Sequence, residues 1–161
     1  MGVPTPVLSN FNRPFDALLQ LQDDASAITV STVGKVATVN RIVDLGDGVV
    51  LADAVFDINA IDVTTGDEMY LCKIEGSTSP TFASGIVTLA VLQLGGATAN
   101  AVVGAESAAS ALTNTKRFPV AFRNHKYGLL FRYVRANFIL SGTSPSLDAE
   151  CYVSPIQTLG A

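Results

Sequence analysis

Residues 133–153, YVRANFILSGTSPSLDAECYV, alternate apolar and polar side chains with a period of two. One face of the two runs is apolar throughout, carrying Val134, Ala136, Phe138 and Leu140 and then Leu147, Ala149, Cys151 and Val153. This period is that of a β-strand with one buried face. The intervening SGTSPS supplies residues that favour turns. The stretch therefore predicts an antiparallel hairpin.

The rest of the chain repeats short runs rich in Val, Ile and Thr. These runs are AITVSTV, KVATVNRIVDL, GVVLADAVFDINAIDV, EMYLCKIEG, GIVTLAVLQL and KRFPVAF. Gly-, Asp-, Ser- and Asn-rich segments such as LGDG, TTGDE, GSTSPTFASG and RNHKYG separate them and are typical of turns. Seven or eight strands with almost no helix predict an all-β fold, an antiparallel β-sandwich or barrel, of which the jelly roll is one member. The 161 residues suit a single domain.

The N-terminal residues differ in composition from the strand runs. Pro4, Pro6 and Pro14 exclude a continuous helix or a central strand there. We therefore expect residues 1–20 to form an extended arm and residues 21–161 to form the domain. The apolar side chains that would hold the arm against its own domain or against a neighbouring molecule are Val7, Leu8, Phe11 and Phe15. The sequence leaves both alternatives open.

A second unusual segment is GGATANAVVGAESAASALTNT, residues 95–115. It contains seven alanines and a single charged residue, Glu106. A loop of this length in a compact domain is uncommon unless it has a function such as binding. Contact with a partner and a harmless insertion are both compatible with its composition.

Charge is scarce and unevenly distributed. Charged residues make up 15% of the chain, against about 25% in an average soluble protein. The net charge of −4 argues against a general nucleic-acid-binding protein, which needs basic residues to neutralise phosphates. Residues 16–75 hold eleven acidic and three basic residues, whereas residues 116–135 hold six basic residues and no acid. The two segments could neutralise each other through cross-strand pairs, or present opposite charges across an interface between subunits.

The residue types needed for catalysis are present but are not arranged in a recognisable motif. His125 is the only histidine, it lies in a predicted turn, and no G-x-S-x-G motif accompanies it. We interpret it as a solvated loop residue. The neighbouring carboxylates Asp67 and Glu68, and likewise Asp148 and Glu150, are interpreted as solubility features. The sequence thus predicts a protein that is not an enzyme.

Metal, disulfide and membrane features are equally weak. Asp44, Asp47 and Asp53 do not have the spacing of an EF-hand calcium loop, so we expect no metal and no cofactor. Cys72 and Cys151 lie on apolar strand faces and are predicted to be buried thiols, although a disulfide between them stays open. The longest apolar run, IVTLAVL, is too short to span a bilayer, and we expect no membrane partner and synthesis in a cytoplasm.

The order of the strand and turn motifs points to a known family. IVDLGDG is followed by VFDINAIDVTTGDEMYLCKIEGSTSPTFASGIVTLAVLQLG, by RFPVAFRN and by RYVRANFILSGTSPSLDAECYVS. This order resembles the jelly-roll cement proteins, or decoration proteins, of tailed bacteriophages. The likeness covers roughly residues 17–156 and is carried by structural signatures, none of which is a catalytic motif. The arm and the alanine-rich segment match no pattern.

The resemblance implies a jelly-roll protein that binds the outer surface of the phage head after synthesis in the bacterial host. Its partners would be the major capsid protein and further copies of itself, in a homotrimer, with no specific nucleic acid. It would cement capsid subunits against the internal DNA pressure. The alternative function is a receptor- or carbohydrate-binding module of the virion surface or tail. The residues that we expect at interfaces are Phe11, Arg13, Phe15, Glu106, Arg123, His125 and Lys126.

Overall fold

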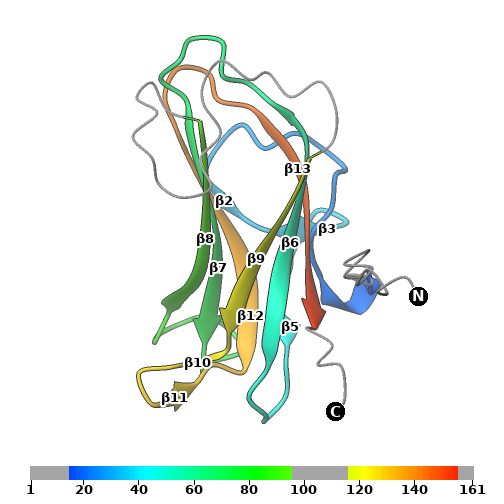
Figure 1. Ribbon diagram of the computed structural model, residues 1–161, viewed down its shortest axis with the longest axis vertical. Coiled ribbons are helices and arrows are strands. Elements are labelled where there is room, and N and C mark those ends of the chain that lie inside the picture. The colour runs from blue at the N-terminus through cyan, green and yellow to red at the C-terminus, as the bar shows by residue number, and fades with distance from the viewer. Residues whose placement is uncertain (1–14, 96–115, 156–161) are drawn as a thin grey trace, which may run out of the picture.

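The computed structural model describes residues 15–95 and 116–155, which form two antiparallel β-sheets packed face to face (Figure 1). The first sheet has the order β1 (Gln20–Gln22), β13 (Leu147–Pro155), β6 (Leu51–Ile61) and β9 (Lys116–Arg123). The second has the order β2 (Thr32–Val33), β12 (Tyr133–Ser141), β7 (Met69–Ser77) and β8 (Val87–Gly95), and β5 (Val43–Asp44) also pairs with β12. The predicted all-β, antiparallel fold is confirmed.

Three small elements complete the described chain. A 3₁₀ turn, η1 (Ala17–Leu19), precedes β1. Two short hairpins form separate two-stranded sheets, one made by β3 (Lys35–Val36) with β4 (Val39–Asn40) and the other by β10 (His125–Lys126) with β11 (Leu129–Leu130).

The predicted hairpin of residues 133–153 is wrong in its pairing. Both runs are strands, but β12 pairs with β7 in the second sheet whereas β13 pairs with β6 in the first. The turn residues between them therefore cross from one sheet to the other. Strands that face each other across a core bury alternate side chains just as paired strands do, so the alternating pattern could not distinguish the two arrangements.

The core lies between the inner faces of the two sheets. Phe56 of β6 meets Phe138 of β12 edge to face, with ring centroids 6.5 Å apart, and neither side chain is exposed. Cys72 and Cys151 enter this core from opposite sheets as free thiols, which confirms that they are buried. Aromatic pairs of this geometry add to the stabilisation that burial of apolar area provides.

The run KVATVNRIVDL is not one strand, as its composition suggests, but the β3–β4 hairpin followed by β5. Ala37 and Thr38 form its turn and have φ angles of 50° and 68°. Such positive angles are unfavourable for residues with a Cβ, and for a β-branched threonine in particular. The Asp23 carboxylate accepts a hydrogen bond of 2.6 Å from the Ala37 N–H, which holds the turn in place.

Gly34 closes one edge of the structure, where β1 of the first sheet approaches β12 of the second. Its N–H donates to the Ala136 carbonyl at 2.9 Å. A Cβ on Gly34 would lie 2.2 Å from the Leu21 carbonyl oxygen and 3.0 Å from the Ala136 Cβ. Only a glycine therefore permits this close approach between backbones.

We expect Gly34→Ala to lower the free energy of unfolding by about 2 kcal/mol or more, because the backbone must move to admit the methyl group. Denaturant titration followed by circular dichroism measures this loss. Gly48→Ala is the matched control, since a Cβ there meets no atom within 4 Å. Equal stability of the two variants would contradict the packing at this edge.

Burial also controls the reactivity of the two thiols. It raises the pKa of Cys72 to about 12 and the pKa of Cys151 well above its ordinary value. Because the thiolate is the reactive form, neither cysteine should react with Ellman's reagent at pH 8 in the folded protein, and both should react in denaturant. Rapid labelling of the native protein would contradict this prediction.

Candidate interaction surfaces

Of the residues expected to form the arm, the structure describes residues 15–20. Phe11 and Arg13 lie outside the described residues, as does Glu106 of the alanine-rich segment. Phe15 lies edge-on against Tyr152 of β13, with ring centroids 5.2 Å apart, and keeps 52% of its surface exposed. This contact puts Phe15 on the outer face of its own first sheet, beside η1.

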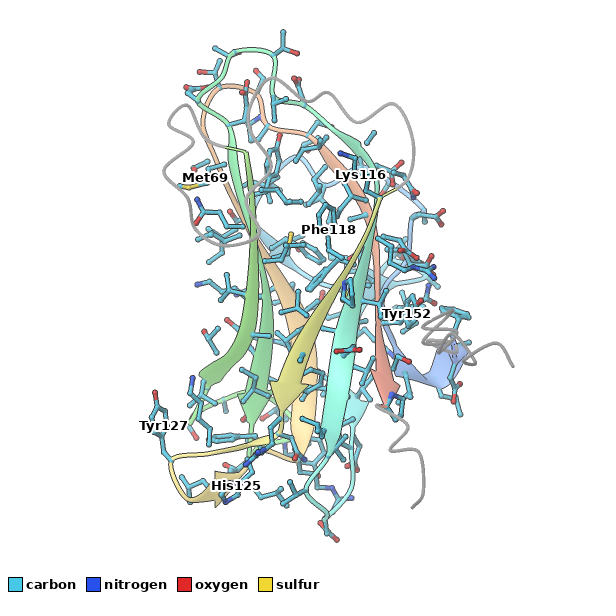
Figure 2. The ribbon with its side chains drawn as sticks, viewed as in Figure 1. Met69, Lys116, Phe118, His125, Tyr127 and Tyr152 are labelled. Atoms are coloured by element: carbon cyan, nitrogen blue, oxygen red, sulfur yellow. The ribbon has the colours of Figure 1, made fainter. Side chains whose placement is uncertain are left out.

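An ion pair crosses the outer face of the first sheet. Arg117 donates to both carboxylate oxygens of Asp57 at 2.7 Å, and its guanidinium lies 5.9 Å from the centre of the Tyr152 ring. Figure 2 shows Tyr152 on this side of the sheet. Hydrogen bonding to Asp57 raises the pKa of Arg117. The bidentate geometry fixes both side chains, which favours a defined surface over a mobile one.

The same face holds an excess of acid. Glu150 of β13 lies directly opposite Asp57 of β6, and like charges in this position repel. Gln20 donates to the Glu150 carboxylate at 2.8 Å. Burial raises the pKa of Glu150, and the charge of Asp24 adds to the effect. At neutral pH the ionised Glu150 side chain therefore lowers the free energy of unfolding. It is not the simple solubility feature that we inferred from the sequence.

The pKa shift of Glu150 gives a prediction with a definite sign. A raised pKa means that the folded state holds this proton more tightly than the unfolded chain, so Glu150 destabilises the fold as the pH rises above the ordinary glutamate pKa. We expect Glu150→Gln to raise the melting temperature at pH 7 and to have little effect near pH 3, as measured by differential scanning calorimetry.

Asp62→Asn is the control of opposite sign. Hydrogen bonding from Thr64 lowers the pKa of Asp62, so its carboxylate stabilises the fold above the ordinary aspartate pKa and this stabilisation is lost as the pH falls. The control should lower the melting temperature at pH 7. Equal effects of the two substitutions at pH 7 would contradict the assignment.

The outer face of the second sheet is apolar over half its length. Tyr70 and Cys72 point into the core, so Met69 and Leu71 on the same strand point outward. Ile139 pairs with Leu71 on the neighbouring strand. Val91 of β8 is 43% exposed on the same face but lies opposite Lys73, and Gln93 lies opposite Leu71, so two polar side chains interrupt the apolar ones. Figure 2 shows Met69 projecting outward from the sheet. We call Met69, Leu71, Val91 and Ile139 the apolar outer face.

The other half of this face is polar and rigid. Arg135 donates to Glu75, its direct cross-strand neighbour, at 2.9 Å. Asn137 donates to the same carboxylate at 2.8 Å. The Arg135 guanidinium also stacks over Phe82, 4.3 Å from the centre of the ring. These contacts join Arg135, Asn137 and Glu75 in one hydrogen-bonded network.

One end of the sandwich gathers three loops: residues 45–50, residues 78–86 and the β10–β11 hairpin (Figure 1). We call it the hairpin end. Asn124 is completely buried there and connects the loop of residues 45–50 to the β10–β11 hairpin. Its side chain accepts from the Val50 N–H at 2.7 Å and donates to the Gly48 carbonyl at 3.0 Å, while its backbone carbonyl accepts from the Phe131 N–H at 2.7 Å.

The hairpin end brings together three of the residues expected at interfaces, Arg123, His125 and Lys126. It also holds half of the large apolar side chains that are exposed among the described residues, namely Val49, Leu51, Ile86, Tyr127 and Leu129. Sequence analysis missed Tyr127 and Leu129. We interpreted the whole segment RNHKYG as one turn. In the structure only Tyr127 and Gly128 form the turn, because Lys126 already pairs with Leu129. A two-residue loop that ends in glycine was the feature of the sequence that could have indicated this hairpin.

Within the described residues, several arginines of the basic segment 116–135 form ion pairs with acids of the acidic segment 16–75. Arg117 and Arg135 each pair with the acid directly opposite on the neighbouring strand, Asp57 and Glu75. Arg132 binds Asp44 through two hydrogen bonds and Asp47 through a third. The interpretation as local cross-strand neutralisation is therefore confirmed for Arg117 and Arg135, whereas Arg132 is neutralised locally from outside the strands.

The acidic turn of residues 62–68 is structural, which corrects the interpretation of Asp67 and Glu68 as solubility features. Asp67 accepts from the Thr143 N–H at 3.0 Å and from its hydroxyl at 2.9 Å. Glu68 is 1% exposed and accepts from the N–H groups of Thr65 and Gly66. Burial raises the pKa of Glu68, but hydrogen bonds from its own backbone and from these residues outweigh burial and lower it overall.

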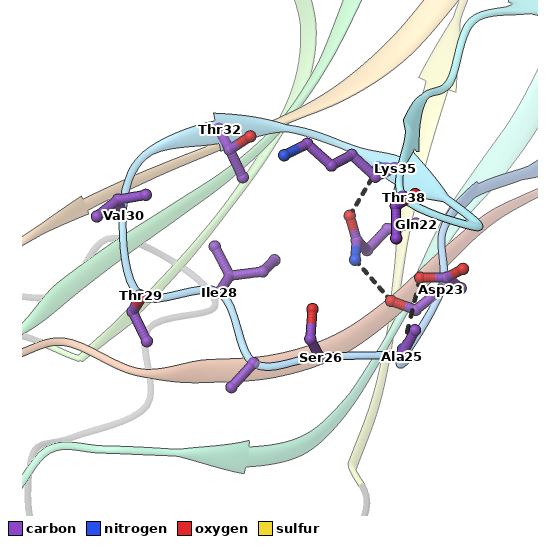
Figure 3. Close-up of a pocket in the computed structure, with 11 residues that line it drawn as sticks. Gln22, Asp23, Ala25, Ser26, Ile28, Thr29, Val30, Thr32, Lys35 and Thr38 are labelled. Atoms are coloured by element: carbon purple, nitrogen blue, oxygen red, sulfur yellow. Dashed lines mark hydrogen bonds between the residues drawn. The ribbon is translucent and has the colours of Figure 1, made fainter.

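A small pocket of about 230 Å³ lies beside β1 and the β3–β4 hairpin (Figure 3). The Gln22 side chain lines it at one side, donating to the Asp23 carbonyl at 2.6 Å and accepting from the Lys35 N–H at 2.8 Å. Figure 3 shows Lys35 extending along its rim toward Thr32. The Gln22 amide is thus used by the fold, and Ile28 supplies an apolar wall.

Comparison with known proteins gives no relative from which to assign the chain. No protein-family model, curated protein or solved structure matches it. In the part of the chain that the structure describes, no helix is long and apolar enough to cross a membrane. Across the same residues, no three His, Cys, Asp or Glu side chains are grouped so as to hold a metal ion.

Proposed function

We propose that the protein is a non-enzymatic structural protein of a phage virion, which binds the outer surface of the head and cements the major capsid protein subunits. The fold that we propose for it is a jelly roll. The order β1-β13-β6-β9 in one sheet and β2-β12-β7-β8 in the other supports this topology, because the chain passes between the sheets at almost every connection from β6 onward. Such crossings are typical of two interlocked Greek keys.

The observation that carries the proposed function is the apolar outer face formed by Met69, Leu71, Val91 and Ile139. When one face of an antiparallel sheet is exposed to water, that face usually carries polar side chains. Contiguous apolar patches outside the core mark surfaces that bind other proteins. A second sheet whose outer face is apolar in part, in addition to its buried inner face, therefore favours a protein that works by being covered, either by the capsid or by another copy in a homotrimer.

Cementing needs only modest affinity at each site. A protein that binds the intact shell but not its separated subunits stabilises the shell by mass action. Many copies across subunit boundaries add their contributions and slow the rupture of a head under internal DNA pressure. A sandwich with fixed ion pairs on its polar surfaces suits this task, because little conformational freedom is lost when it binds.

The test compares phage particles with and without this protein. We expect particles that lack it to release their DNA at lower temperature than complete particles, and we expect added purified protein to restore the difference. DNA release can be followed with an intercalating dye during heating. Equal release temperatures for the two particles would refute the cementing role.

A further inference from the structure

We propose that the tip of the β10–β11 hairpin, Tyr127 together with Leu129, inserts into an apolar depression of the capsid shell that is rimmed by carboxylates. This inference rests on the proposed function and adds the contact through which the protein recognises the shell. It is carried by the conformation of the turn, by the contacts that hold the hairpin and by the charges around it.

The conformation of the turn favours a role in binding. His125 pairs with Leu130 and Lys126 with Leu129, which leaves Tyr127 and Gly128 as a two-residue loop. Their φ angles are 54° and 76°. Loops with two positive φ angles prefer Asn, Asp or Gly at the first position, because an ordinary side chain is strained there. A tyrosine in that place is worse for the fold than an asparagine.

The Tyr127 side chain gains little within the molecule in return. It is 80% exposed, the most exposed large apolar side chain of the described residues. Figure 2 shows it projecting away from the sandwich at the turn. Its ring contact within the fold is with the Lys126 amino group, 5.2 Å from the ring centre. Backbone strain beneath an exposed side chain that makes few contacts within the fold favours a role for that side chain in binding.

The hairpin that carries this side chain is held firmly. The Lys126 amino group donates to the Thr88 carbonyl of β8 at 2.7 Å, which ties the hairpin to the second sheet. At its base, Phe131 is 2% exposed and bonds to the buried Asn124. A tip that is already fixed in its binding conformation loses little entropy on docking. Tyrosine is also among the residues that most often dominate binding energy.

The surroundings define the chemistry of the partner. Leu129 is 56% exposed beside Tyr127, and Val49 and Ile86 lie on the two flanking loops, so the centre of the contact is apolar. Arg123 and His125 are exposed at the same end. The nearby acids Asp44 and Asp47 are already bound to Arg132. The hairpin end thus presents an apolar tip with basic residues near it, which complements an apolar depression with carboxylates at its rim.

The decisive variant is Tyr127→Asn. Asparagine suits the positive φ angle, so the variant should fold and melt at the same or a higher temperature than the original protein. Its binding to phage particles that lack this protein, measured by co-sedimentation over a range of concentrations, should weaken about tenfold or more. Leu129→Ser should weaken it in the same assay. Arg123→Glu should weaken binding most at low salt, where charge contributes most.

The matched control is Val39→Ser. Val39 is 67% exposed beside the positive-φ turn of the other short hairpin, β3–β4, and its substitution should leave binding unchanged. Original protein that fails to sediment with the particles would overturn the proposed function itself. If the wild-type protein and Tyr127→Asn bind the particles equally well, only the insertion of the hairpin would be overturned. A change in oligomeric mass of Tyr127→Asn, measured by light scattering, would assign the tip to a contact between copies and would also overturn it.

Discussion

The fold depends on one core that two sheets share. Each long strand contributes every second side chain to it, and the contact of Phe56 with Phe138 joins the middle strands of opposite sheets. Because successive strands such as β12 and β13 lie in different sheets, the core is assembled from contacts that are distant in sequence. Neither sheet can be stable alone, because its apolar inner face would then be exposed to water.

This shared core leaves the outer surfaces free to differ. On the first sheet the Asp57–Arg117 pair organises a polar face, and on the second sheet Arg135 does so over half the area. The remaining half carries Leu71 and Ile139 on central strands. One molecule thus combines surfaces that ion pairs organise with a partly apolar surface that gains free energy when covered. This asymmetry, rather than a catalytic cleft, is what the structure offers for function.

The sequence was informative where a local rule determines the outcome. Alternation along residues 133–153 correctly predicted two strands and their buried faces, and the apolar neighbours of Cys72 correctly predicted a buried thiol. Pairing could not be obtained in the same way, because β12 and β13 would show the same alternation in a hairpin. Gly34 was unremarkable in the sequence, since its role depends on how closely Leu21 approaches Ala136.

Some candidate contact residues could likewise be predicted from the sequence, whereas others required the structure. Basic residues near position 125 could be selected from charge alone, whereas Tyr127 required the register of β10 with β11. Glu68 was misjudged because an acid in a turn is usually solvated, and only the three-dimensional structure shows that backbone N–H groups hold it in a buried position. Local patterns therefore predicted elements and burial, but not the contacts that give individual side chains their roles.

The two short hairpins differ in how the strain of their turns is compensated. Both turn through a pair of positive φ angles, and in both the first residue carries a side chain that disfavours them. At Ala37 the fold compensates, because the Asp23 carboxylate binds the strained backbone directly. At Tyr127 the side chain extends into solvent, and its lysine contact is of a kind that contributes little when exposed. Strain that the fold compensates stabilises an internal junction, whereas strain beneath an exposed aromatic ring favours a contact outside the molecule.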